Sequence, residues 1–148
     1  MALIAGDPEL QRLYRRLLSV TGIAQASAVQ LLAELVVLPP DMAVRQWVAH
    51  AGLDPRPFDS GSSVHRPVRI SKQGNARLRA ALYFPAMTAM RHETHVTAFA
   101  QKLGTRGLTG LQVVAAVMRK LLHAIYGMWK HDSDWQGEKF FAAAGVRA

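Results

Sequence analysis

Apolar residues recur at helical spacing along most of this chain. Near its start, Asp7 followed by Pro8 is typical of a helix N-terminus, because Asp caps free amides and Pro is tolerated at the first helical position. The apolar stripe that follows consists of Leu10, Leu13, Tyr14, Leu17 and Leu18. This spacing predicts a helix over residues 8–19, and a second apolar face over 28–35 predicts another. Gly22 lies between them, so we expect a helical hairpin.

Two further helices are expected before and after a polar stretch in the middle of the chain. One should surround Trp47, with Asp41 as its cap and Gly52 closing it in the left-handed conformation. The other should begin at about Asn75, where apolar residues resume at helical spacing.

The C-terminal third of the chain predicts two more helices. A short one is expected over 94–103, closed by Gly104, and a long one over 109–129 should be the main core element. Residues 131–148 alternate polar and aromatic positions and are interpreted as a tail, which packs back on the domain, joins a partner chain or stays loose. The sequence therefore predicts an all-α fold of about six helices with one long basic loop.

That loop is the stretch 54–74, which is too polar and too rich in Pro and Gly to cover a core. Between Pro55 and Arg91 there are seven Lys or Arg residues and a single acid, Asp59. The cations that we interpret as candidate nucleic-acid contacts are Arg66, Arg69, Lys72, Arg77 and Arg79. Phosphate is the anion they suit best, because an Arg fork makes two parallel hydrogen bonds to phosphate oxygens.

Arg77 and Arg79 stand near the expected start of the fourth helix. Cations there oppose the positive end of the helix dipole, which is unfavourable unless an anion binds. This conflict supports a phosphate site, and two solvated arginines are an equally good interpretation.

Composition narrows the class of partner. The chain has 148 residues, half of them apolar, and a formal charge of +8, which favours a polyanionic partner. Arg outnumbers Lys thirteen to five, which suits phosphate recognition and equally fits a GC-rich genome. No cysteine is present, so disulfides and thiolate metal sites are excluded. We find no signal peptide and no membrane-spanning run, and we expect a cytoplasmic protein without a membrane partner.

Several ordered runs resemble one known family. They are AHAGLDPRPFDSGSS, RISKQGNARLRAALY and VVAAVMRKLLHAIYG, with LLSVTGIAQASAVQLLAEL upstream. Together they resemble the C-terminal serine domain of the insertion-sequence 110/116/902 transposase family, from about Leu17 to Lys130. The resemblance implies a domain over 1–130 followed by a tail over 131–148. In that family a RuvC-like domain with four acidic residues is joined to this domain, and DNA recombination is guided by a structured RNA.

The resemblance implies a role for Ser60. It is the first serine of the SGSS run, which is the nucleophile position of the family, and nearby cations would stabilise charge on the attacked phosphate. Without the resemblance, SGSS is typical of an ordinary turn. No counterpart of the acidic domain is seen, so we expect no cofactor in this chain and Mg²⁺ only with that domain. The implied partners are DNA, a structured guide RNA, a RuvC-like domain in trans and further copies of the chain.

The predicted N-terminal hairpin, SVTGIAQASAVQLL, also resembles a helix-hairpin-helix DNA module. In such modules a Gly turn presents backbone amides to phosphate, which makes Gly22 a candidate nucleic-acid contact. Ala24 stands where a second glycine is usual. A plain helical corner is the alternative interpretation.

Two other function classes stay open. A non-catalytic nucleic-acid binding domain needs only the basic loop and the hairpin, and an oligomerisation fragment needs neither. Metal binding has little support, because His92 and His95 lie three residues apart without an obvious third ligand. We interpret both histidines as surface residues.

Overall fold

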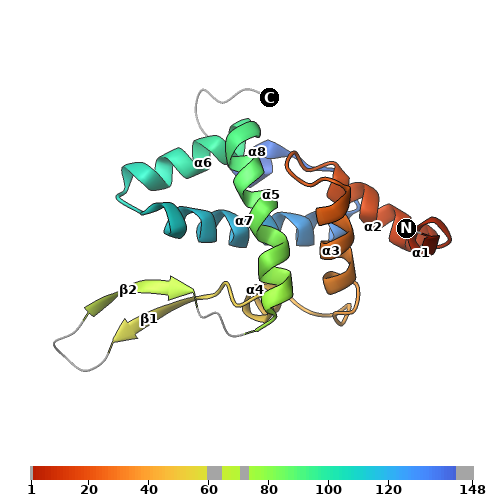
Figure 1. Ribbon diagram of the computed structural model, residues 1–148, viewed down its shortest axis with the longest axis horizontal. Coiled ribbons are helices and arrows are strands. Elements are labelled where there is room, and N and C mark those ends of the chain that lie inside the picture. The colour runs from red at the N-terminus through yellow and green to blue at the C-terminus, as the bar shows by residue number, and fades with distance from the viewer. Residues whose placement is uncertain (1, 60–64, 71–73, 143–148) are drawn as a thin grey trace.

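Helices form the body of the molecule, and a two-stranded ribbon projects from one end of it (Figure 1). Figure 1 is a computed structural model, which describes residues 2–59, 65–70 and 74–142. In these ranges the helices are α1 (Ala2–Ala5), α2 (Pro8–Leu18), α3 (Gln25–Leu35), α4 (Val44–His50), α5 (Ala76–His92), α6 (Thr94–Thr105), α7 (Gly110–His131) and α8 (Gly137–Phe140), and the strands are β1 (Pro55–Asp59) and β2 (His65–Ile70). Six of these helices have seven or more residues, so the predicted all-α class and helix number are confirmed.

The predicted N-terminal hairpin is formed by α2 and α3. Asp7 caps α2, since its Oδ1 atom accepts hydrogen bonds from the amides of Glu9 at 2.9 Å and Leu10 at 3.3 Å. Gly22 lies in the turn with a φ of +114°. The buried residues of the two helices are Leu13, Tyr14, Leu17, Ala28, Leu31, Leu32 and Leu35. They join one continuous apolar core with the later helices.

The centre of the core is the crossing of α5 and α7 (Figure 1). Both helices turn fully buried leucines inward, Leu78 and Leu82 from α5 and Leu121 and Leu122 from α7. α7 was predicted as the main core element, and this prediction is confirmed. No helix within 2–59 and 74–142 is long and apolar enough to span a membrane.

Two helix ends differ from the prediction. Asp41 does not cap α4, because the residue before the helix is Ala43, whose amide instead donates to Oε1 of Gln46 at 2.7 Å. Gly104 does not close α6, which continues to Thr105, and the left-handed glycine is Gly107 at φ +88°. A glycine inside a helix costs about 1 kcal/mol, so one such residue is not enough to end α6.

A buried polar pair occupies the corner between α5 and α6. Glu93 caps α6, since its Oε2 atom accepts from the amide of Val96 at 2.9 Å. Its Oε1 atom lies 3.1 Å from Nδ1 of His95, and both side chains are almost fully buried. The interpretation of His95 as a surface residue was therefore wrong. The local sequence did not reveal that α8 covers this corner, where a β-carbon on Gly137 would collide with the His95 ring.

The chain after α7 folds back onto the helical body. Arg16 of α2 bonds Asp134 at 2.7 Å, and the amide of Trp135 donates to Oγ of Ser19 at 2.9 Å. Phe140 is buried against Phe99 of α6, with ring centroids 5.5 Å apart. Residues 132–141 therefore pack against α2, α6 and α7.

Candidate nucleic-acid interface

The basic stretch forms a ribbon where we expected a loop. β1 and β2 pair antiparallel, with Pro55 opposite Ile70 and Arg56 opposite Arg69, and the register shifts between Arg56 and Phe58. The loop prediction was wrong for 55–59 and 65–70, because it treated the three prolines in these ranges as evidence against strands. Each strand of a two-stranded ribbon has a free edge, and a proline that faces this edge removes no ladder hydrogen bond.

The register of the ribbon places two cationic residues at paired positions of its strands. Arg56 and Arg69 occupy opposite positions of the ladder, and Arg66 lies opposite Phe58. Like charges at opposite positions of an antiparallel pair are unfavourable.

Two arginines hold the first root of the ribbon, residues 51–54. Ala51 and Leu53 are fully buried there. Nη1 of Arg79, from α5, donates to the carbonyl oxygen of Ala51 at 3.2 Å. Nη1 of Arg119, from α7, donates to the carbonyl oxygen of Leu53, also at 3.2 Å. Burial lowers the pKa of Arg119, because its guanidinium is partly removed from water.

The second root, residues 74 and 75, is tied to α3 and α4. The amide of Asn75 donates to the carbonyl of His50 at 2.6 Å, and its side-chain nitrogen donates to Glu34 at 2.6 Å. Its Oδ1 atom caps α5 by accepting from the amide of Arg77 at 2.8 Å. Gly74 has a φ of +136°, and a β-carbon there would collide with the His50 carbonyl. Both roots are thus fixed to the helical core.

The candidate residues from the sequence fall into three groups. Ser60 and Lys72 lie outside the described residues. Arg66 and Arg69 lie in β2. Arg77 and Arg79 lie in the first turn of α5, but Arg77 is exposed whereas Arg79 is half-buried on the Ala51 carbonyl. The contact with Ala51 gives Arg79 a structural role that the sequence did not reveal.

Gly22 also has a structural role. At its φ of +114°, a β-carbon would lie 2.9 Å from the Pro85 carbonyl oxygen and 2.9 Å from the Ala89 amide nitrogen, both in α5. Only glycine allows the hairpin turn to approach α5 this closely. The close packing against α5 explains why this position needs glycine, without any contact with nucleic acid. A contact of Gly22 with phosphate stays a prediction.

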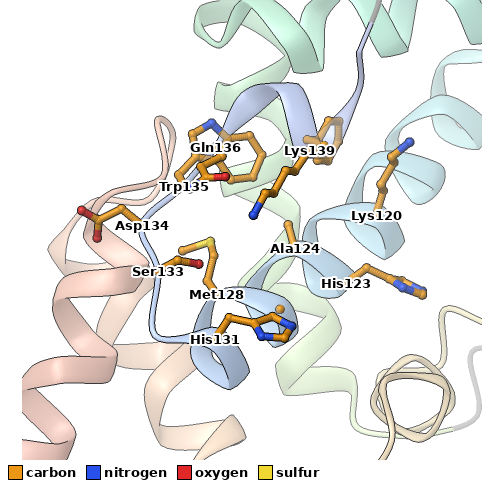
Figure 2. Close-up of a pocket in the computed structure, with 12 residues that line it drawn as sticks. Lys120, His123, Ala124, Met128, His131, Ser133, Asp134, Trp135, Gln136 and Lys139 are labelled. Atoms are coloured by element: carbon orange, nitrogen blue, oxygen red, sulfur yellow. The ribbon is translucent and has the colours of Figure 1, made fainter.

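Sequence reasoning missed a second basic surface, a pocket of about 240 Å³ between α7 and the segment that follows it (Figure 2). Its polar lining consists of Lys120, His123, His131, Ser133, Asp134, Gln136 and Lys139. In Figure 2, Lys139 reaches from α8 toward Ala124 of α7. The helical spacing of Lys120, Ala124, Gly127 and His131 was a usable signal for the α7 side, but nothing local placed α8 against it.

Positive charge is concentrated at this pocket. Nζ of Lys120 lies 4.4 Å from the ring centroid of Phe99, and burial together with the charge of Lys102 lowers the pKa of Lys120. Burial, with the charges of Arg119 and Lys120, also lowers the pKa of His123. Among the described residues that line the pocket, Asp134 is the one carboxylate, and it is paired with Arg16 at 2.7 Å. The pocket therefore suits an anion better than a cation.

Metal binding finds no support in the part of the chain that the structure describes. No group of three or more His, Asp or Glu side chains there could hold an ion. Glu34 and Glu93 instead have structural partners, Asn75 and His95.

The sequence of this chain is similar to those of several known proteins. A model of the transposase IS116/IS110/IS902 family matches residues 14–101, which contain the ribbon and both of its roots. The pilin gene-inverting protein of Moraxella bovis is 30% identical over 127 residues, which cover 85% of this chain and 39% of that protein. Its counterpart from Moraxella lacunata gives the same values. A putative transposase of Sinorhizobium fredii, y4rJ, is 38% identical over 93 residues, which cover 59% of this chain and 22% of that protein. The chain thus spans well under half the length of these relatives.

Proposed function

Because this chain belongs to the transposase IS116/IS110/IS902 family, we propose that it is the part of a DNA recombinase that supplies the nucleophilic serine. The observation that carries the proposal is the basic ribbon, whose two strands flank the SGSS run and whose roots are fixed to the helical core. Ser60 directly follows the last residue of β1 in the sequence. A serine at this position would be presented to a sugar-phosphate strand by a cationic scaffold.

The proposed chemistry is a phosphoryl transfer to Ser60. Its Oγ atom attacks a DNA phosphorus, the bond from phosphorus to one sugar oxygen breaks, and that oxygen takes up a proton. The Oγ proton passes to a base, for which Asp59 is the carboxylate nearest in sequence. Arg66 and Arg69 are candidates to stabilise the negative charge on the phosphoryl oxygens during attack. Reversal of the step with a new sugar hydroxyl joins a different strand.

The remaining partners follow from the family and are part of the proposal. The relatives named as gene-inverting proteins are longer than this chain. We propose that a RuvC-like acidic domain, in the same polypeptide or in trans, completes the enzyme and holds Mg²⁺. DNA is the substrate, a structured RNA is the guide, several copies assemble on the DNA, and the reaction takes place in the cytoplasm.

A covalent-adduct assay tests the nucleophile. The protein is incubated with labelled DNA from the ends of its element, with and without the cognate acidic domain, and resolved under denaturing conditions. We expect a labelled protein band that Ser60→Ala abolishes and that the neighbouring control Ser62→Ala retains. An adduct that persists in Ser60→Ala would refute the assignment, and loss only in Ser62→Ala would move it to that residue.

A binding domain without catalysis is the second candidate, and the paired ribbon arginines favour it independently of Ser60. It predicts DNA affinity that falls steeply with salt, because bound phosphates release counterions. Ser60→Ala should then bind as the unchanged protein does and no adduct should form. Arg69→Gln should weaken binding, whereas Arg45→Gln, at an exposed position of α4, serves as the control. Absence of binding at moderate salt would leave the oligomerisation interpretation.

A further inference from the structure

The outward face of α5 carries an unusual pair of exposed aromatic residues. Phe84 is 72% exposed and Tyr83 is 37% exposed. Their ring centroids lie 5.4 Å apart with an interplanar angle of 83°. Large apolar side chains that remain in water on a folded surface are informative when they form a cluster.

Two arginines flank this aromatic pair at equal distances. Arg77 lies seven residues before Phe84 and Arg91 seven residues after it, and both are exposed. Seven residues make about two helical turns, so the three side chains share one face and follow each other at about 10 Å along the axis. The residues between them on this face are the small Ala80 and Thr88.

No acidic residue of α5 compensates the charges on this face. The 17 residues of α5 include no Asp or Glu. Among the side chains that the structure describes, in residues 3–55 and 74–142, neither Arg77 nor Arg91 forms an ion pair. The face therefore combines two available guanidinium groups with a central aromatic platform.

This face is continuous with the root of the ribbon. Asn75, which anchors the second root, caps α5 and accepts from the amide of Arg77. Figure 1 shows α5 leading away from that root across the front of the molecule. A strand that leaves the ribbon along α5 would meet Arg77 first and the aromatic pair next.

We propose that this face binds a single-stranded segment of nucleic acid, with bases stacked on Phe84 and Tyr83 and phosphates held by Arg77 and Arg91. The inference rests on the proposed function for the class of partner, which is nucleic acid. It adds a binding site on α5 and specifies that the bound nucleic acid is single-stranded. Aromatic rings stack unpaired bases of any sequence, and Arg forks pair with phosphate. A duplex buries its base faces between neighbouring pairs and offers nothing to Phe84. A protein partner fits less well, because a stable interface needs a larger apolar centre than this pair flanked by Ala80 and Thr88.

The test measures, by fluorescence anisotropy, the affinity of several protein variants for several nucleic-acid ligands. The ligands are a labelled oligothymidylate of about twelve nucleotides, an abasic strand of equal length, and a duplex. We expect Phe84→Ala to weaken binding of the oligothymidylate at least about fivefold and to leave the abasic strand and the duplex unchanged. Phe84→Trp should retain the affinity. Leu111→Ala, which removes a 77% exposed apolar side chain from α7, should have no effect.

The flanking arginines are tested by salt dependence. Arg77→Gln and Arg91→Gln should each reduce the slope of log affinity against log salt for the single strand by roughly 0.7. Oligouridylate of equal length distinguishes RNA from DNA as the strand. Urea midpoints of all variants show whether the fold is retained.

Several results would overturn the inference. Equal losses on the oligothymidylate and the abasic strand would exclude base stacking, as would unchanged affinity of Phe84→Ala. If Phe84→Ala instead changes the sedimentation coefficient of the protein alone, the face is a protein interface. If the protein binds duplex DNA but its affinity for the oligothymidylate does not depend on Phe84, this inference fails and the proposed function stays intact. Absence of binding to every nucleic acid would refute both.

Discussion

Nη1 of Arg119, in the middle of α7, lies 3.2 Å from the carbonyl oxygen of Leu53, which is 66 residues earlier in the sequence. Arg79 of α5 makes the equivalent bond to Ala51. The two central helices of the core therefore each donate one hydrogen bond to the same root of the ribbon. The direction in which the ribbon leaves the body is set by the core and not by the ribbon alone.

Replacing Arg119 should loosen this root. Arg119→Met keeps an apolar side chain but leaves the buried Leu53 carbonyl without its donor, which should lower the free energy of unfolding by about 1–3 kcal/mol. Urea denaturation measures the loss, and amide hydrogen exchange should accelerate at Leu53. Arg45→Met, at an exposed position of α4, is the matched control and should change neither. If Arg119→Met is as stable as Arg45→Met, the bond to Leu53 does not hold the root.

Substitution of Gly22 distinguishes a packing role of this residue from a contact with nucleic acid. Gly22→Ala forces a β-carbon against the α5 backbone at a positive φ and should lower the free energy of unfolding by about 2–4 kcal/mol. Gly107 also has a positive φ, but a β-carbon there meets nothing within 4 Å, so Gly107→Ala should cost only about 1–2 kcal/mol. Thermal unfolding of the two variants gives the difference. If Gly22→Ala is as stable as the unchanged protein but loses DNA affinity, the result would instead favour phosphate contact at the turn.

Glu93 should contribute more than an ordinary cap. Glu93→Ala removes the acceptor for the Val96 amide and leaves the buried His95 without its partner, for a combined cost of about 2–4 kcal/mol. Asp7→Ala removes an exposed cap from α2 and should cost about 1 kcal/mol. Urea midpoints compare the two. Similar losses would mean that the contact between Glu93 and His95 contributes nothing beyond capping.

The sequence predicted those parts of the fold that depend on local spacing. The apolar stripes of α2 and α7 needed no knowledge of their neighbours, and the start of α5 near Asn75 followed from apolar spacing in the same way. Gly52 was identified from capping chemistry alone. The ribbon was missed because its prolines argue against a strand unless the free edges are known.

The site was harder to predict than the fold, because it depends on contacts between distant segments. Packing decides whether an arginine near a helix start faces solvent or a carbonyl group. Arg77 and Arg79 therefore had the same interpretation from the sequence, although Arg77 is exposed and Arg79 contacts the Ala51 carbonyl. The burial of His95 and the pocket at Lys120 both require α8 to fold back. No local pattern in residues 131–148 specifies that position.

His123 should make the stability of the protein depend on pH. Its pKa is lowered from the usual value of 6.5 by burial and by the charges of Arg119 and Lys120, and Lys139 and His131 line the same pocket. In the pH range just below 6.5 the unfolded chain therefore binds more protons at this residue than the native protein does. Stability should fall as the pH drops through this range and should be insensitive to His123 well above it.

The measurement is a series of urea midpoints from about pH 8 to about pH 5, a range that covers the titration of histidine. His123→Gln removes the group that must protonate, so the fall in stability on acidification should be smaller than in the unchanged protein. His92→Gln removes an exposed histidine outside the pocket and serves as the comparison. A His123→Gln variant that loses as much stability on acidification as the unchanged protein would show that neither burial nor the charges of Arg119 and Lys120 oppose protonation of His123.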